Sequence, residues 1–496
     1  MAFHFNYFCM MLKRITVFIF LWLLIYIPVS AQEKWDLQRA VEYALDNNVS
    51  VKLQDLQTRF SNLNYKQGKA SQLPSLNASG NAGFQFGRSE NPTTGVLEDN
   101  NFFSSGLNLQ TQVTVFNWFT KKNTIEADRL SFEADKEQVR QTQNDIALNV
   151  AVAYLQILLA KEQANIARIQ VSLTSDQLSN TRKRVDAGAL PELNAAELEA
   201  QLARDSASLV SAEAAVTQFV LQMKALLNLD ASLPFDVETP PVDMIPVQSL
   251  ADLQPESVYA LAIANLPQQK VNSLRLQSAM KTVDAAKGNL YPSITAYGSL
   301  GSNYVHFKPR PVYEQVITGF APSGLRADAG GGVFYDVQRP VTVNGNTVIS
   351  TISADPLGDQ FRANFGQGIG LSLSVPIFNG KQARTNWERT KLEVSRLQLQ
   401  NQQSDMVLKQ DIYKAYYDAV AAIEKFNANK KGVETAQKSL DFATKRYDLG
   451  LLSTFEIINT QNNLQRAKID MVYAQYDYVF KVKLLEFYKG QGLKLQ

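Results

Sequence analysis

The chain has 496 residues, with 49 basic and 47 acidic side chains, two histidines and one cysteine. This length suffices for about three average domains. The near balance of charges gives no support for a nucleic-acid partner. With so few cysteines and histidines, neither a disulfide framework nor a Cys/His metal cluster is possible, and we expect no metal and no cofactor.

The first 31 residues have the pattern of a secretory signal peptide. Lys13 and Arg14 precede an apolar run from Ile15 to Ile27, and Val29-Ser30-Ala31 supplies the small residues that a signal peptidase requires. The run is short for a membrane span, and an uncleaved anchor is the alternative interpretation. Cleavage would remove two basic residues and no acidic one, which leaves 47 of each sign and a net charge of zero.

Enzymatic chemistry has few candidate residues in this chain. Cys9 and His4 lie in the signal segment, so the mature chain would keep His306 as its single histidine. A Ser-His-Asp enzyme would have to use this residue, which belongs to the Pro-rich stretch "HFKPRP". An exposed loop histidine is the simpler interpretation, and we expect no catalytic activity.

The sequence contains two copies of one plan, because short motifs recur at fixed spacings. Leu73-Pro74-Ser75 recurs as Tyr291-Pro292-Ser293, 218 residues later. From Val115-Phe116-Asn117 onward the matching residues lie 262 apart, as in Ile377-Phe378-Asn379. The second copy therefore carries 44 extra residues between these two motifs. A constant register outside that region and free insertion within it separate packed elements from a loop.

Two alternating regions in each copy predict β-hairpins. In each of four segments of roughly ten residues, apolar side chains occupy one face and small or polar side chains the other, a pattern typical of transmembrane β-strands. A soluble antiparallel sheet packed on a core produces the same alternation, and this alternative stays open from the pattern alone. The predicted apolar positions are Leu76, Ala78, Ala82, Phe84 and Phe86; Leu107, Leu109, Val113 and Val115; Ile294, Ala296, Leu300 and Tyr304; and Ile369, Leu371, Leu373, Val375 and Ile377.

Four strands cannot close into a barrel on their own. In a bilayer, an open sheet would leave two edges of unpaired backbone groups, each of which costs several kcal/mol. If the strands lie in the membrane, several chains must therefore share the barrel.

Long Pro-free segments flank the predicted strands. The segments 118–187 and 381–449 predict helices of about 70 residues, or roughly 100 Å. They return through 192–228 and 453–488, and shorter helical segments at 36–73 and 255–290 would cover the rest of each long helix. An ordinary soluble coiled coil is the alternative that periodicity alone supports.

The two long helices end in nearly the same sequence motif, "KRVDAGAL" at 183–190 and "KRYDLGLL" at 445–452. Gly188 and Gly450 suit the left-handed conformation that ends a helix, and the preceding basic residues suit the helix dipole. Pro191 then begins one returning helix, and Ser453 to Glu456 has the capping-box pattern for the other. Turn chemistry does not explain Asp186 and Asp448. An acidic side chain in the last turn of a helix is unfavourable because the C-terminal end of the helix dipole is negative.

In this order, these features make the chain resemble the TolC family of outer-membrane efflux channels over nearly its whole mature length. The features are the double repeat, the Pro-Ser strand starts, the "VFNW" and "PIFNG" strand-to-helix junctions and the paired glycine turns. The resemblance implies a mixed α/β membrane protein: a homotrimer with a twelve-stranded barrel, four strands per chain, and a long periplasmic helical tunnel that closes at the two turns. The junction residues are Pro74, Asn117, Pro292 and Asn379.

On this plan the chain divides into nine parts. These are a signal peptide (1–31), helices of the first repeat (32–74), a transmembrane β-hairpin (75–116), a long helical hairpin (117–228), a Pro-rich connector (229–254), helices of the second repeat (255–292), a second β-hairpin (293–378), a second long helical hairpin (379–488) and a tail (489–496).

The resemblance also implies a gate at the glycine turns. Tyr447 would lie at the constriction, and Glu456 matches a lumen-facing acid, for which capping and gating are compatible roles. The family's other charged positions are occupied here by Asn459, Leu452 and Asn194, so a strict salt-bridge lock is not expected. A ring of three Glu456 side chains would favour cations. With Asp186 and Asp448, these polar residues are the candidate gating set.

The turn residues would also contact the family's partners. The resemblance implies that a periplasmic adaptor docks there and links the channel to an inner-membrane pump. No phosphate-binding loop occurs in the chain, so it would be a passive conduit. The expected docking residues are Gly188, Leu190, Gly450, Leu452 and Ser453.

The 44 extra residues, at roughly 306–360, depart from the compact family pattern. Asn344-Gly345 between β-forming residues predicts a hairpin turn. We expect an exposed loop or partial lid at the cell-surface end. Its function is left open.

Two other functions fit the sequence less well. A periplasmic coiled-coil adaptor or scaffold needs no lipid-facing strands, and a general diffusion porin would not be mostly helical. The exported cargo, whether small molecules or polypeptides, is not encoded in an obvious way.

Overall fold

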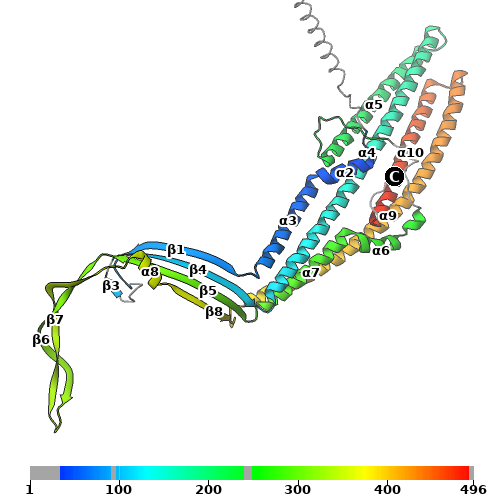
Figure 1. Cartoon of the computed structure of the whole chain (residues 1–496). Helices are drawn as coiled ribbons and strands as arrows, with labels where there is room; N and C mark the ends of the chain where they lie inside the picture. The colour runs from blue at the N-terminus through cyan, green and yellow to red at the C-terminus, as the bar shows by residue number, and fades with distance from the viewer. Residues whose placement is uncertain (1–33, 91–96, 100, 240–248, 491–496) are drawn as a thin grey trace, which may run out of the picture. The chain divides into compact units, whose positions relative to one another are not determined.

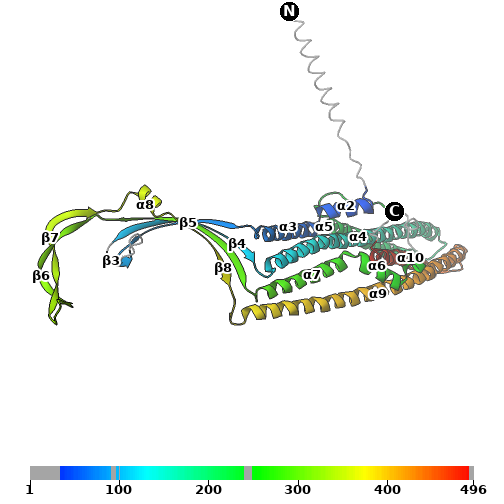
Figure 2. The ribbon, with the colours of Figure 1, turned by 60° about the horizontal axis from the view of Figure 1, so that its bottom comes forward.

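The computed structural model describes residues 34–90, 97–99, 101–239 and 249–490, so the predicted signal peptide and parts of the predicted connector and tail lie outside the described residues. The chain forms two compact units (Figures 1 and 2). One contains the residues up to Asn62, Arg129–Ser278 and Val394 onward. The other contains Leu63–Asp128 and Ala279–Glu393.

The helices repeat with the spacings seen in the sequence. α4 (Thr120–Asp186) and α9 (Gln382–Asp448) have 67 residues each and lie 262 residues apart in the chain. They return through α5 (Glu192–Leu227) and α10 (Thr454–Tyr488). No helix in the described part of the chain is both long and apolar enough to cross a membrane.

Each shorter helical segment is divided in two, which the sequence analysis did not anticipate. α2 (Leu37–Asn47) and α3 (Val49–Ala70) meet at Asn48, whose side-chain oxygen accepts a 2.8 Å hydrogen bond from the Ser50 N–H. α6 (Pro255–Asn265) and α7 (Pro267–Gly288) meet at Leu266. Leu266 is extended because the following proline disfavours the helical conformation for the residue before it.

The four predicted strand segments form one antiparallel sheet, in the order β1 (Ser75–Gln85), β4 (Phe102–Phe116), β5 (Ser293–Phe307) and β8 (Gly366–Ser374). The register sets Ala78 opposite Leu109, and Leu109 opposite Leu300. Because side chains alternate between faces along a strand, the predicted apolar positions in the regular part of these strands share one face of the sheet, whereas Val115 lies at a bulge between Thr114 and Phe116. A pair of three-residue strands, β2 (Arg88–Glu90) and β3 (Leu97–Asp99), follows β1.

The predicted loop region contains a second β element. β6 (Arg310–Asp328) and β7 (Phe334–Ile352) form a two-stranded antiparallel ribbon, followed by the short helix α8 (Leu357–Ala363). The prediction of a turn at Asn344-Gly345 was wrong, because these residues lie within β7, where the register shifts.

The ribbon turns instead at three consecutive glycines between β6 and β7. Gly330, Gly331 and Gly332 have φ values of 83°, 71° and 85°. Glycine adopts this left-handed region without steric cost, so this run sets the turn.

The junctions from strand to long helix also repeat. Pro74 and Pro292 directly precede β1 and β5. The backbone carbonyl of Asn117 accepts a 3.0 Å hydrogen bond from the N–H of Thr120, the first residue of α4. The carbonyl of Asn379 accepts a 3.2 Å hydrogen bond from the N–H of Gln382, the first residue of α9.

After each junction asparagine, two residues have positive φ. They are Trp118 (50°) and Phe119 (60°) in the first repeat and Gly380 (64°) and Lys381 (63°) in the second. Two bulky aromatic residues in this region are strained, and their rings pack locally: the Trp118 and Tyr291 ring centroids lie 4.7 Å apart.

A hydrophobic cluster joins α2, α4, α5 and α10 in the helical unit. Its fully buried members include Ile157, Leu158, Met223 and Leu227. The connector begins beside this cluster. Val237 forms an isolated β-bridge with Trp35, and the Tyr154 hydroxyl donates a 2.7 Å hydrogen bond to the Glu238 carbonyl. A second cluster packs the 3-10 helix η2 (Leu250–Leu253) and α6 against α9 and α10.

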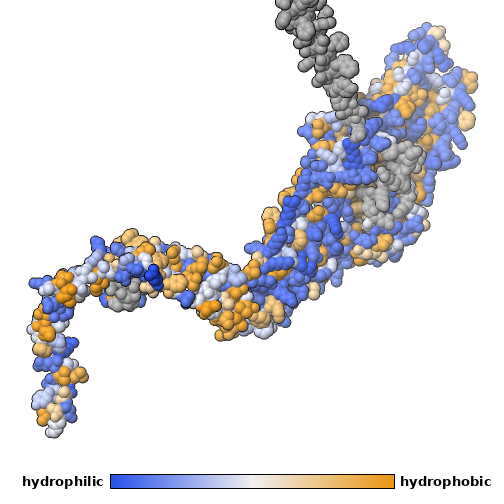
Figure 3. Space-filling model, in the orientation of Figure 1, coloured by the Kyte–Doolittle hydropathy of each residue, from blue (hydrophilic) through white to orange (hydrophobic). Residues whose placement is uncertain are grey.

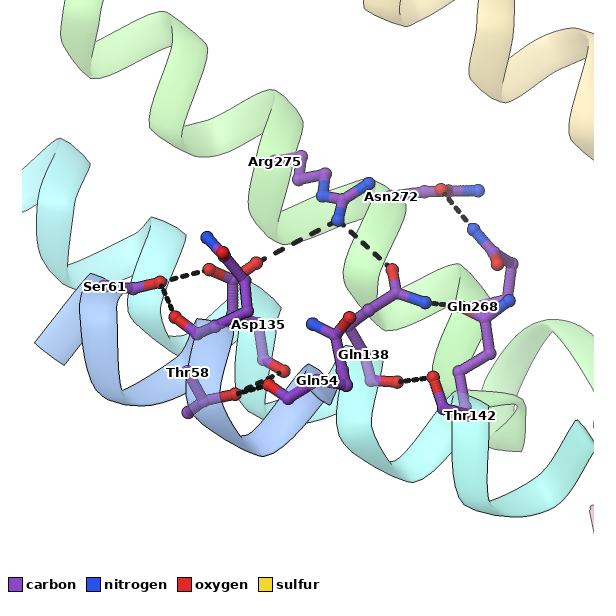
Figure 4. A network of polar contacts seen from close by, with 11 residues as sticks. Gln54, Thr58, Ser61, Asp135, Gln138, Thr142, Gln268, Asn272 and Arg275 are labelled. Carbon is purple, nitrogen blue, oxygen red and sulfur yellow. Dashed lines mark hydrogen bonds and ion pairs between the residues drawn. The ribbon is translucent and has the colours of Figure 1, made fainter. Parts of the chain in front are cut away.

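A buried polar network holds α4 against one short helix from each repeat (Figure 4). Asp135 of α4 is 9% exposed, and its carboxylate accepts a hydrogen bond from the Ser61 hydroxyl of α3. Arg275 of α7 approaches the same carboxylate at 4.0 Å and donates to the Gln138 side chain at 3.2 Å. A buried carboxylate is stable only with such partners, so the network fixes how the two repeats meet in the helical unit.

The glycine turns can be tested by substitution. Gly188 (φ 75°) and Gly450 (φ 71°) have no atom within 4 Å of an added Cβ, so alanine at either position would introduce backbone strain alone. Each substitution should destabilise the protein by about 1–2 kcal/mol. Gly432 within α9 also has open space around it, and Gly432→Ala should stabilise by about 0.5–1 kcal/mol. Thermal unfolding of the three variants, followed by far-UV circular dichroism, measures these changes in stability. Equal effects at all three glycines would contradict the left-handed conformation assigned to Gly188 and Gly450.

Candidate functional site at the helical hairpin ends

The two long helices end in the same hydrogen-bonded motif. The Gly188 N–H donates to the Val185 carbonyl at 2.8 Å, and the Ala189 N–H donates to the Arg184 carbonyl at 2.8 Å. In the second repeat, Gly450 donates to Tyr447 at 2.9 Å and Leu451 to Arg446 at 2.8 Å. This pairing, with glycine in the left-handed conformation, is a Schellman motif. The prediction of left-handed glycines at both turns is confirmed.

The returning helices begin differently in the two repeats. Pro191 is the N-cap residue of α5 and makes no side-chain capping bond. Ser453 caps α10 in a complete capping box: its hydroxyl accepts from the Glu456 N–H at 3.3 Å, and the Glu456 carboxylate accepts from the Ser453 N–H at 3.1 Å. The capping role predicted for Glu456 is thus confirmed, whereas its gating role stays a prediction.

Ion pairs bridge the first hairpin close to its turn. Arg182 near the end of α4 pairs with Glu192 and, at 2.6 Å, with Glu199 of α5. These contacts raise the pKa of the Arg182 guanidinium, chiefly through the hydrogen bond to Glu192, with a smaller contribution from Asp186. Asp186 therefore has a favourable neighbour one turn away, which offsets its conflict with the helix dipole. The positions 262 residues further on are Thr444, Thr454 and Gln461, so the second hairpin lacks this bridge.

Tyr447 lies in the interior of the second hairpin and reaches across to the first. It is 8% exposed and packs with Leu440, Ile457 and Leu464. Its hydroxyl lies 3.2 Å from the Thr181 hydroxyl of α4 and 3.4 Å from the Thr454 hydroxyl of α10. Sequence analysis singled out Tyr447 but not its partners, because the nearer one is 266 residues away in the chain.

More polar side chains join the two hairpins behind Tyr447. Gln177 of α4 accepts a 2.6 Å hydrogen bond from Gln461 of α10, whose own side-chain oxygen is buried without a partner. Gln201 of α5 donates to Asn462 of α10 at 3.1 Å and to the buried carboxylate of Asp205 at 2.8 Å. The two hairpins therefore meet near their ends through polar contacts, which we call the polar seam. Such contacts can be exchanged for water when the hairpins separate more easily than hydrophobic contacts can. Polar residues at helical spacing, such as Gln201 and Asp205, are the signal of this seam in the sequence.

The other predicted gating residues lie on the surface. Asp186, Asp448 and Asn459 are exposed, and Asn194 is partly buried in the first turn of α5. The structure thus brings Glu456 and Ser453 together and sets Tyr447 between the hairpins, but it does not join Asn194 to Tyr447 by a side-chain hydrogen bond.

The predicted docking residues cluster at the turns themselves. Gly188, Gly450 and Ser453 are exposed, whereas Leu190 and Leu452 are partly buried. Leu452 packs against the small cluster around Tyr447. No group of residues that could hold a metal ion occurs in the described ranges.

The bridging hydroxyl of Tyr447 should contribute to stability. Thr181 and Thr454 are 2% and 1% exposed, so Tyr447→Phe would leave two buried hydroxyls with one partner fewer. We expect a loss of about 1 kcal/mol in thermal or denaturant unfolding. Tyr417→Phe, at a side chain that is 65% exposed, is the matched control and should change stability by less than about 0.5 kcal/mol. Equal losses would contradict the buried bridge.

The capping box should make stability depend on pH. The Ser453 N–H and hydroxyl hold the pKa of the Glu456 carboxyl below its usual value. A depressed folded-state pKa means that the stabilisation is complete above the ordinary glutamate pKa of about 4.3 and is lost as the pH falls through the folded-state value. The melting temperatures of wild type and Glu456→Ala should therefore differ at neutral pH and converge in acid. A difference that persists unchanged in acid would contradict this account.

Comparisons with known proteins agree with this architecture. A family model described as "Outer membrane efflux protein" matches residues 40–229 and 343–490. The outer membrane efflux protein BepC of Brucella suis biovar 1 (strain 1330) is 21% identical over 446 residues, which cover 89% of this chain and 82% of that protein. The outer membrane protein TolC of Vibrio cholerae serotype O1 is 22% identical over 425 residues, covering 84% and 81%.

Among solved structures, the chain is similar to CusC, in a study of conformational changes that accompany folding and transmembrane channel formation. The TM-score is 0.72 at 17% identity, and the match covers 93% of both chains. The likeness shows a shared fold, that of a mixed α/β channel whose chains combine long helical hairpins with barrel strands. Since the family model matches more than half of the sequence, the chain belongs to the outer membrane efflux protein family, the TolC family of outer-membrane channels.

Proposed function

We propose that the protein is the passive outer-membrane exit channel of a tripartite efflux or type I secretion system and works as a homotrimer. The observation that carries this proposal is the four-stranded sheet. β1 and β8 each pair on one side only, and Leu76, Leu371 and Ile369 on its apolar face are 67%, 71% and 93% exposed. Lipid would cover this face, and strands from other copies would satisfy the open edges.

Three copies would give a barrel of twelve strands with an open, water-filled interior. The opposite face of the sheet would line it, with Asn77, Gln110 and Ser299 in one row across β1, β4 and β5. β1, β4 and β8 contain no aspartate, glutamate, lysine, arginine or histidine, and β5 contains one such residue, His306. A neutral polar lumen would pass solutes of either sign, so charge selection would have to occur at the hairpin ends.

The hairpin ends would form the gate. The polar seam and Tyr447 would hold the two hairpins of each chain together, and opening would exchange these contacts for others. In a trimer, three Glu456 side chains would lie near the axis and attract cations. The exposed turn residues Gly188, Gly450 and Ser453 would contact a periplasmic adaptor, which would connect the channel to an inner-membrane pump.

Planar-bilayer recording of the purified protein tests this function. We expect small, cation-selective openings, with selectivity lowered in Glu456→Gln. Glutamine keeps the capping-box geometry while it removes the charge, so stability should stay near wild type. Glu434→Gln, at an exposed acid of α9 outside the candidate gating set, serves as the control. An unchanged reversal potential in Glu456→Gln would exclude the acidic ring, whereas failure to insert into the bilayer would argue against a membrane pore.

A further inference from the structure

The β6–β7 ribbon is the largest element of the chain that the channel function leaves without a role. Its two strands have 19 residues each and, among the described elements, make extensive contact only with each other. An isolated two-stranded ribbon is marginally stable in water, and its outer edges are open to further pairing. This ribbon is therefore expected to gain stability from a partner.

One face of the ribbon is largely apolar. Alternation along β7 sets Tyr335, Val337, Val341 and Val343 on one side together with one charged residue, Arg339, and the register adds Val316, which lies opposite Val343. The four valines are 37–49% exposed and the tyrosine is 64% exposed. We call these five residues the ribbon face. Figure 3 shows hydrophobic residues interspersed with hydrophilic ones along the ribbon.

The other side of the ribbon is more polar. Arg326 and Asp336 form an ion pair at 2.8 Å, and the Gln315 side chain donates to that of Asn344 at 2.6 Å. Ile317 and Phe320 also lie on this side, opposite Thr342 and Pro340, and Phe334 lies there two residues before Asp336. The asymmetry makes the ribbon face the better candidate for a contact.

Prolines limit how the ribbon can associate. Pro311, Pro322 and Pro340 have no N–H and interrupt the rows of backbone donors on both strands. Prolines of this kind on open edges discourage edge-to-edge addition of further strands. Contact through the face remains the better way to bury apolar surface.

The base of the ribbon is anchored beside the edge that other copies must complete. β5 extends beyond the end of β8, and α8 takes the place of β8 there. The buried Gln360 side chain accepts from the Val305 N–H at 3.0 Å and donates to the Val305 carbonyl at 2.8 Å. The Asn364 side chain donates to the Asn303 carbonyl at 2.8 Å. The ribbon thus begins at the far end of the sheet, next to β8, an edge strand that must pair with another copy in the proposed trimer.

The charge of the ribbon permits contact between copies. Residues 310–352 contain three arginines and three acidic residues, a net charge of zero. Three ribbons without net charge would show little long-range repulsion, and a neutral ribbon has little attraction for anionic lipid headgroups.

We propose that the ribbons of neighbouring copies pack against one another through the ribbon face and form a cap at the outer end of the shared barrel. The proposal rests on the trimer proposed above. It assigns the 44 extra residues to self-association of the channel.

Single cysteines test the proposal directly, because the sequence after the predicted signal has no cysteine of its own. Val341→Cys lies on the ribbon face, and Thr342→Cys, the next residue, lies on the opposite side. After treatment of outer membranes with a short bismaleimide, Val341→Cys should yield about fivefold more cross-linked dimer than Thr342→Cys, because adjacent strand residues point to opposite faces.

A native gel of the same samples and the masses of the adducts distinguish the outcomes. Equal yields, or no cross-link within an intact trimer, would overturn the proposed cap and leave the channel function standing. An adduct of Val341→Cys with a different protein would assign the ribbon face to another partner and also overturn the cap. Absence of a trimer on the native gel would contradict the proposed function, and the cap with it.

Discussion

The rest of this architecture depends on backbone groups that cannot be left unpaired in lipid. The four-stranded sheet has an apolar face that suits hydrocarbon, but within the described part of the chain its two edge strands, β1 and β8, each pair on one side only. An unsatisfied amide in a bilayer costs several kcal/mol, so the sheet is complete only when other copies supply the missing strands. The oligomer is thus a condition for the membrane fold.

The duplicated halves keep the same backbone but hold their hairpin ends with different side chains. Both halves end their long helices in the same Schellman motif. The first hairpin is bridged by Arg182 with Glu192 and Glu199, whereas the second relies on the capping box and on Tyr447. Exposed ion pairs contribute little stability, and a buried hydroxyl bridge contributes more. The second hairpin is therefore the more tightly specified of the two, and it also carries the acid proposed for the gate.

The insertion shows where the fold tolerates change. The matching helices of the two repeats have equal lengths or, for α5 and α10, lengths of 36 and 35 residues, while the 44 extra residues extend the connection between β5 and β8. Among the described elements, α8 packs against β5 at that end of the sheet, and the long ribbon is accommodated there without any change in the register of the four-stranded sheet. Its apolar face then creates a need for contact, which copies of the same chain are placed to meet.

The sequence by itself determined the elements whose causes are local. Helical periodicity, the Ser453–Glu456 cap, the glycines at 188 and 450 and the alternation of Leu107 and Leu109 with polar residues all depend on neighbours in the chain, and the structure has them. The sequence did not reveal the break at Asn48, because the residues on both sides favour a continuous helix, or the turn at Gly330–Gly332, because Asn344-Gly345 is an equally plausible turn. At Asn344-Gly345, strand pairing overrode the local turn preference. Only the tertiary structure decided that Tyr447 meets Thr181, that α8 replaces β8 beside β5 and that the ribbon has one apolar side. These features arise from contacts between residues far apart in sequence, which no local pattern specifies.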